Sequence, residues 1–127
     1  MTLNIRTEST SAQRITLFVE GRLDASTFGE FDAEVPERLA DVPDGGTVVL
    51  DLQGLEYISS AGLRSFARIR KQMRTRRVQT LLLNPQPQVR KVFDIVKAVP
   101  VNEIFVTARE LDEYLDRIQR SILQEED

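Results

Sequence analysis

The stretch Val48-Val49-Leu50-Asp51-Leu52, followed by residues 53–58 and then by Ser59-Ser60-Ala61-Gly62-Leu63, decides the fold of this chain. The apolar run with β-branched residues predicts a buried strand. The serine pair ahead of an apolar-periodic segment predicts the start of a helix. A hydroxyl is therefore expected where a strand passes into a helix, beside free amides and the positive end of the helix dipole. Such a place suits a phosphate, so a serine there is a candidate phosphorylation switch.

Strand and helix patterns alternate on both sides of this stretch. Strands are predicted at Ile15–Glu20, Thr47–Leu52, Thr80–Leu83 and Ile104–Val106, with a shorter one near Leu3–Arg6. Helices are predicted from about Thr27, from Ala61 to Arg76, from Pro87, and at about 108–123 ahead of an acidic tail at 124–127. The alternation predicts a single α/β domain over residues 1–127 with a mostly parallel sheet.

The first helix carries two local signals of its own. Asp24 or Ser26 is expected to cap it. Pro36 lies inside it and is expected to kink it or to split it in two, because proline lacks the amide hydrogen that a helix interior needs.

The composition argues against several kinds of active site. The 127 residues include no cysteine and no histidine, which removes disulfides, thiolate nucleophiles, the Ser-His-Asp triad and the usual zinc ligands. Phosphate-binding glycine motifs and calcium-binding loops are also missing from the sequence. We therefore expect no catalytic residue, no metal and no cofactor, and a binding module rather than an enzyme.

Charge and hydropathy bear on location and partners. The net charge is -3, which gives no overall attraction to nucleic acid. The first residues lack the apolar core of a signal peptide, and no apolar run approaches the roughly 18 residues that a membrane span needs. We expect a cytoplasmic protein without membrane insertion, as a monomer or weak dimer.

About two thirds of the chain, from Gly21-Arg22-Leu23-Asp24 to Glu103-Ile104-Phe105, resembles the STAS domain, and within it the bacterial anti-sigma factor antagonists. The most specific part is Val49-Leu50-Asp51-Leu52 followed by Tyr57-Ile58-Ser59-Ser60-Ala61-Gly62-Leu63. Asn84-Pro85-Gln86-Pro87-Gln88-Val89 and the helix with Phe93 support it. The resemblance implies a single mixed, mostly parallel sheet with helices packed mainly on one face.

The resemblance also implies a role in transcription regulation without catalysis. Such proteins bind an anti-sigma factor that is also a serine kinase, and thereby free a sigma factor. The kinase phosphorylates a serine in the strand-to-helix loop, the modified antagonist dissociates, and a serine phosphatase resets the switch. Alignment on Gly62 puts this phosphoserine at Ser60, with Ser59 as a minor candidate where many members have aspartate.

Three residues of the predicted site have a structural interpretation beside the functional one. Ser60 can be a plain helix cap, and caps typically stabilise by about 1 kcal/mol. Asp24 can cap the first helix, or can be an acid on the kinase-binding surface. Position 62 can require glycine because the helix start is tight, or because the kinase approaches the backbone there. The predicted partner-binding residues are Asp24, Ser59, Ser60, Ala61, Gly62, Arg64, Arg68 and Lys71.

A basic run follows the serine pair. Seven basic residues and no acid lie between positions 64 and 77: Arg64, Arg68, Arg70, Lys71, Arg74, Arg76 and Arg77. Such a run can be a solvated helix face, an electropositive surface for an acidic partner, or a nucleic-acid site. The sequence accordingly leaves alternatives to the antagonist open: a non-switching STAS subunit of a signalling or lipid-transport assembly, a small enzyme, or a nucleic-acid binder.

Overall fold

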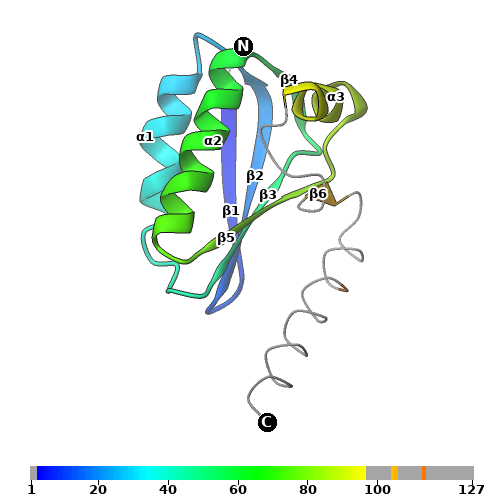
Figure 1. Ribbon diagram of the computed structural model, residues 1–127. Coiled ribbons are helices and arrows are strands. Elements are labelled where there is room, and N and C mark those ends of the chain that lie inside the picture. Colours follow the sequence, from blue (N-terminus) through cyan, green and yellow to red (C-terminus); the bar gives the residue numbers. More distant parts are fainter. Residues whose placement is uncertain (1–2, 97–103, 106–112, 114–127) are drawn as a thin grey trace.

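A computed structural model describes residues 3–96, 104–105 and 113 of the chain. The strands are β1 (Leu3–Ser11), β2 (Arg14–Leu23), β3 (Thr47–Asp51), β4 (Leu55–Ile58), β5 (Gln79–Leu83) and β6 (Ile104–Phe105), and the helices are α1 (Phe28–Arg38), α2 (Ser60–Thr75) and α3 (Pro87–Val96). Strands and helices alternate after an initial hairpin, as the sequence pattern predicts (Figure 1).

The strands form one open, mixed sheet in the order β1-β2-β3-β5-β6. Only β1 runs antiparallel to its neighbour, as the first strand of a hairpin with β2. The other pairs are parallel, so the predicted fold class is confirmed. Strand β2 is long enough to pair with β3 along residues 14–18 and with β4 along residues 21–23.

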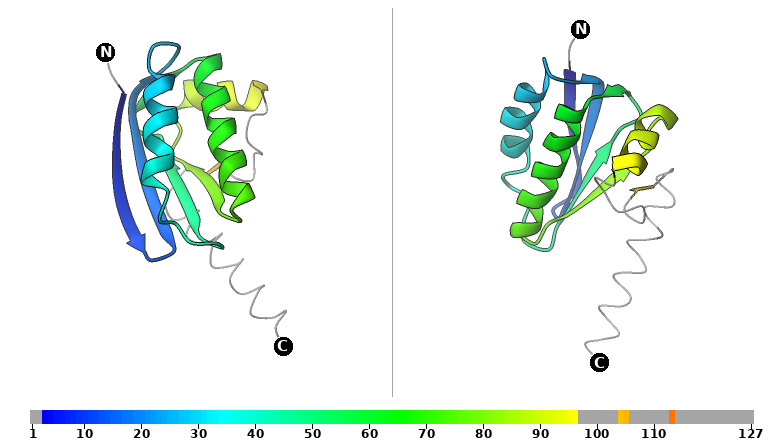
Figure 2. Two further views of the ribbon diagram at one scale, coloured as in Figure 1. Left: turned by 90° about the vertical axis from the view of Figure 1, so that its left-hand side faces the viewer. Right: turned by 45° about the horizontal axis from the view of Figure 1, so that its top comes forward.

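All three helices cover the same face of the sheet. Helices α1 and α2 lie side by side in the views of Figures 1 and 2, and α3 lies beyond α2. A row of buried aromatic rings joins them: Phe66 of α2 lies 5.2 Å from Phe31 of α1 and 5.5 Å from Phe93 of α3, measured between ring centroids. Burying each ring contributes about 1.5 to 3 kcal/mol to folding. The predicted packing of helices mainly on one face is thus confirmed.

Two details of the prediction are wrong. No strand was predicted at residues 55–58, yet β4 forms there and extends the sheet along β2. Pro36 does not split α1, which is continuous from Phe28 and ends at Arg38, two residues after the proline, so the split is wrong while a kink stays a prediction. Proline lacks the amide hydrogen that would bond to the carbonyl oxygen of Asp32, so α1 does without that one bond, and the helix ends two residues later.

The last part of the prediction lies largely outside the described residues. Strand β6 confirms the strand predicted at Ile104, while Val106, the helix at about 108–123 and the tail at 124–127 stay predictions. Within the described part of the chain, no helix has the length and hydropathy to cross a membrane.

Candidate functional site

The candidate site lies where β2 and β4 end and α1 and α2 begin. Leu23, the last residue of β2, pairs with Ile58, the last residue of β4. The amide of Ser59 then donates to the carbonyl oxygen of Leu23 at 2.9 Å, which ties the start of α2 to the end of β2. Asp24 directly follows Leu23, so the two loops that carry Asp24 and the serine pair are neighbours. In parallel α/β sheets, ligands bind outside the carboxyl ends of the strands.

Ser59, and not Ser60, caps helix α2. The hydroxyl oxygen of Ser59 accepts from the amide of Gly62 at 3.3 Å, and the carbonyl oxygen of Ser59 accepts from the amide of Leu63 at 2.9 Å. The backbone of Ser59 is extended, as an N-cap requires. The interpretation of Ser60 as a plain cap is therefore wrong, because Ser60 is the first residue inside the helix.

Ser60 is exposed and makes no side-chain hydrogen bond within the described residues. The amides of Ser60 and Ala61 have no acceptor among the described residues either, whereas the next two amides, of Gly62 and Leu63, donate to Ser59. The first turn of α2 holds no acidic residue. A free hydroxyl therefore lies beside unused N–H donors at the positive end of a 16-residue helix.

Gly62 is buried against the end of β2. A Cβ atom at this position would lie 2.7 Å from the carbonyl oxygen of Leu23 and 2.9 Å from side-chain carbons of Ile58 and Leu23. The hydrogen that replaces a side chain thus faces inward, which supports the interpretation that small size is needed at a tight helix start. A contact of Gly62 with a partner stays a prediction.

Asp24 does not cap α1 with its side chain. Thr27 occupies the cap position without a capping side-chain bond, and the carbonyl oxygen of Asp24 accepts the amide of Phe28. The carboxylate of Asp24 instead accepts from the hydroxyl of Ser26 at 2.7 Å and from the amide of Ser26 at 3.0 Å. These two bonds lower the pKa of Asp24 below its ordinary value of 3.8, and the bond from the Ser26 hydroxyl has the larger effect. Asp24 is thus a partly exposed anion held rigid beside the serine pair.

An arginine and a tyrosine that the sequence analysis missed border Asp24. Arg22 pairs with Tyr57 across β2 and β4, and its guanidinium carbon lies 4.3 Å from the centre of the tyrosine ring. The Nε atom of Arg22 is 3.6 Å from the carboxylate of Asp24. Tyr57 and Phe28 are the large hydrophobic residues most exposed in the described part of the chain, at 43% and 36%. Tyr57 lies two residues before the serine pair, and Phe28 is the first residue of α1. Tyrosine and arginine are, with tryptophan, enriched among the residues that dominate protein interfaces.

The basic run after the serine pair does not form one uniform surface. Arg68 donates to the carboxylate of Asp32 on α1 at 2.6 Å and to the buried hydroxyl of Ser65 at 3.0 Å. Arg76 donates to the carbonyl oxygens of Leu39, Ala40 and Val42, which follow the end of α1, with a distance of 2.6 Å to Val42. Within this run, the exposed cations that have no described side-chain partner are Arg64, Lys71, Arg74 and Arg77. Arg68 is therefore part of the α1–α2 contact, not a free charge beside Arg64 and Lys71.

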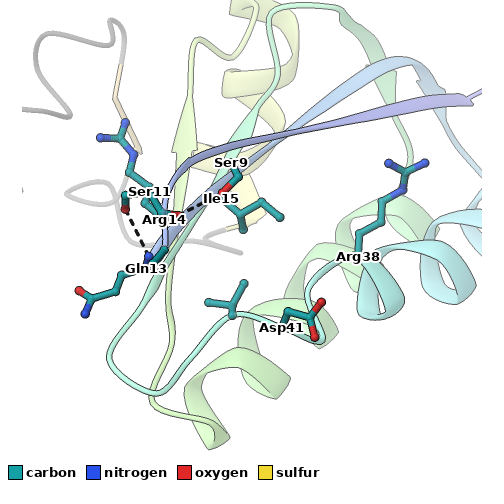
Figure 3. A pocket seen from close by; sticks show the side chains of 9 residues that line it. Ser9, Ser11, Gln13, Arg14, Ile15, Arg38 and Asp41 are labelled. Atoms are coloured by element: carbon teal, nitrogen blue, oxygen red, sulfur yellow. Dashed lines mark hydrogen bonds between the residues drawn. The ribbon is translucent and has the colours of Figure 1, made fainter.

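A depression of about 260 Å³ lies at the opposite end of β2, under the β1–β2 hairpin (Figure 3). Ser11 accepts the amide of Gln13 there, and Ser9 donates to the carbonyl oxygen of Ser11. Arg38 turns away to Thr7 and Glu34. None of the predicted site residues lines this depression. In the part of the chain that the structure describes, no acidic cluster is arranged to hold a metal ion.

Comparison with known proteins agrees with the resemblance seen in the sequence. The STAS domain family profile matches residues 5–111. BtrV of Bordetella bronchiseptica, named as an anti-sigma factor antagonist, is 38% identical over 78 residues, which are 61% of this chain and 65% of that protein. The match thus spans slightly less than two thirds of the length of BtrV.

Solved structures share the fold at low sequence identity. The anti-sigma factor antagonist SpoIIAA in its unphosphorylated form is 21% identical with a TM-score of 0.70, covering 91% of this chain and 96% of that one. Bacillus SpoIIAA in the phosphorylated form is 20% identical with a TM-score of 0.64, covering 91% and 99%. The murine anion transporter Slc26a9 is 16% identical with a TM-score of 0.69, covering 86% of this chain but 18% of the transporter. At these identities the likeness establishes the fold alone.

Proposed function

The chain belongs to the STAS domain family, and from this premise we propose that it is an anti-sigma factor antagonist switched by phosphorylation of Ser60. In the unphosphorylated state it binds an anti-sigma factor with serine kinase activity, which frees a sigma factor. Phosphorylation ends the interaction, and a serine phosphatase restores it. The relative BtrV, named as an anti-sigma factor antagonist, supports this assignment.

One observation carries the proposal: an exposed hydroxyl, Ser60, follows the cap residue at the start of α2, beside two amides without a described acceptor. A kinase can reach this oxygen without unfolding the loop. A phosphate adds about -1.5 to -2 charges at pH 7, and the positive end of a helix tolerates an anion. The fold should therefore survive the modification, and the new charge and bulk should act on the partner.

The partner surface that we propose surrounds Ser60. It comprises the predicted residues Asp24, Ser59, Ala61, Gly62, Arg64 and Lys71, with Arg68 contributing mainly by holding α2 against α1. Polar groups held in place can fix the orientation of a bound partner, and exposed cations can attract an acidic partner and speed its association. The role needs no catalytic group, metal or cofactor.

The test is phosphorylation followed by binding. The chain is incubated with ATP and the serine-kinase anti-sigma factor encoded in the same genome, and intact mass is measured for wild type, Ser60→Ala and Ser59→Ala. We expect one phosphate on wild type and on Ser59→Ala, and none on Ser60→Ala. Full modification of Ser60→Ala would refute the assignment, and no modification of any form would favour a non-switching STAS subunit.

Binding of the same kinase is then measured for two matched charge variants. Ser60→Asp should bind at least roughly tenfold more weakly than wild type, because the negative charge lies in the interface. Ser9→Asp adds the same charge at the far hairpin and should bind like wild type. Equal affinities of all three proteins would contradict the switch.

A further inference from the structure

Strand β1 is an open edge of the sheet. It pairs with β2 on one side, and no described element pairs with its other side (Figure 2). The strand has nine residues, Leu3–Ser11, and contains no proline. Edge strands leave every second N–H and C=O group unpaired, and natural proteins usually cover, shorten or interrupt them. In β1 the irregularity lies only at the end, between Ser9 and Ser11.

The charges on β1 are placed for pairing with a copy of itself. Side chains two residues apart point to the same face of a strand, so Arg6 and Glu8 share one face. Both are exposed. Arg6 already contacts Glu20 at 2.9 Å and covers the ring of Phe18 at 4.5 Å, which holds its guanidinium against the sheet. Glu8 has no partner among the described residues.

We propose that β1 pairs antiparallel with β1 of a second copy, in a two-fold register centred on Thr7. In this register each Arg6 faces Glu8 of the second copy, so two opposite-charge pairs form by one symmetry operation. A register centred on Arg6 or on Glu8 would place like charges directly opposite, which destabilises a sheet. Only the register centred on Thr7 places Arg6 opposite Glu8, so the charge pattern favours this alignment over the others that the edge allows.

The neighbouring positions are compatible with this register. Ile5 would face Ser9 of the second copy, and all these residues lie in the regular part of the β1 ladder before the irregularity. Thr7 pairs with Leu17, six residues before the end of β2 at Leu23, so the axis would lie about 20 Å from the candidate site. The dimer thus leaves Ser60 open, and this inference does not depend on the proposed function.

Cysteine cross-linking tests the register, because the chain contains no cysteine of its own. Directly opposite residues of an antiparallel pair have Cα atoms about 4.5 to 5.5 Å apart, within the range that a disulfide bridges. Thr7→Cys should therefore form a covalent dimer under mild oxidation. The control Ser9→Cys places the two thiols about 13 Å apart along the strands and should cross-link roughly tenfold less or not at all.

Charge variants test the reason for that register. In the Thr7→Cys background, Glu8→Arg should abolish the cross-link. An equimolar mixture of Glu8→Arg and Arg6→Glu proteins should restore it as a heterodimer, because both opposite-charge pairs are re-formed. Thermal melts confirm that each variant is folded, and Glu8 makes no described contact whose loss could unfold the chain. A Thr7→Cys protein that stays monomeric, equal cross-linking at Ser9, or an unchanged cross-link with Glu8→Arg would overturn the proposal.

Discussion

Replacing Gly62 with alanine should destabilise the protein even though alanine is the better helix residue. In an ordinary helix the exchange contributes up to about 1 kcal/mol of stability. At Gly62 the new Cβ atom would lie 2.7 Å from the carbonyl oxygen of Leu23 and 2.9 Å from Ile58. The nearest atom belongs to the backbone of β2 and cannot rotate away. The first turn of α2 must therefore move away from the sheet.

The expected net effect follows from these two opposing terms. Overpacking a well-packed site costs about 1 to 3 kcal/mol, and a backbone neighbour favours the upper part of that range. After the gain in helix propensity, we expect Gly62→Ala to lower the free energy of unfolding by about 1 to 2 kcal/mol. For a domain of this size the melting temperature should fall by about 3 to 8 °C.

Gly29→Ala is the matched control. Gly29 lies in the first turn of α1, and a Cβ atom there would meet nothing within 4 Å. This variant should be more stable than wild type by up to about 1 kcal/mol. Urea unfolding of the three proteins measures both changes under the same conditions. If Gly62→Ala proves as stable as Gly29→Ala, the close approach of α2 to Leu23 does not constrain this position.

Three further predictions follow from the same contacts. Arg68→Glu should lower the free energy of unfolding by about 1 kcal/mol or slightly more, because it replaces the ion pair with Asp32 by like charges. Arg64→Glu should change the free energy of unfolding by less than about 0.5 kcal/mol and should instead slow association with the kinase at low salt. Urea unfolding and stopped-flow binding separate the two effects. Ser59→Ala should cost about 1 kcal/mol in a thermal melt through loss of the α2 cap, and a melt identical to wild type would contradict the capping role. Folding lowers the pKa of Asp24, so the ionised carboxylate stabilises the fold at pH values above the ordinary pKa of 3.8, and this stability is lost as the pH falls through the folded pKa. In an acid titration of unfolding, Asp24→Asn should therefore lose less stability than wild type. Parallel curves for the two proteins would refute this.

Local sequence patterns were sufficient for much of the fold and for the position of the candidate site. The apolar run before Asp51 and the serine pair before Leu63 predict a strand followed by a helix, because strand and helix periodicity act over a few neighbouring residues. The stripe of Leu63, Phe66 and Ile69 is likewise buried as its spacing predicts. The predicted phosphorylation site at Ser60 lies at a helix start for the same local reason, although its modification stays a prediction.

Other features depend on contacts between segments that are distant in the sequence. Strand β4 is short, and both Leu55 and Ile58 are buried although they are three residues apart, because the register against β2 shifts there. That shift breaks the period of two on which strand prediction relies. It also turns Tyr57 outward onto Arg22, a pairing that no local pattern indicates.

The exact roles of the charged and capping residues were likewise set by tertiary structure. Ser59 and Ser60 are equally good caps by residue type, and Ser59 caps because its amide is anchored to Leu23 at the end of β2. Arg68 lies in the basic run by sequence, yet Asp32, 36 residues earlier, neutralises it where α1 packs on α2. The sequence by itself determined the elements other than β4 and where the strand-to-helix turn lies. The packing of α1, α2 and β2 against one another decided which side chains that turn leaves free, because hydrogen bonds and ion pairs depend on distances in space.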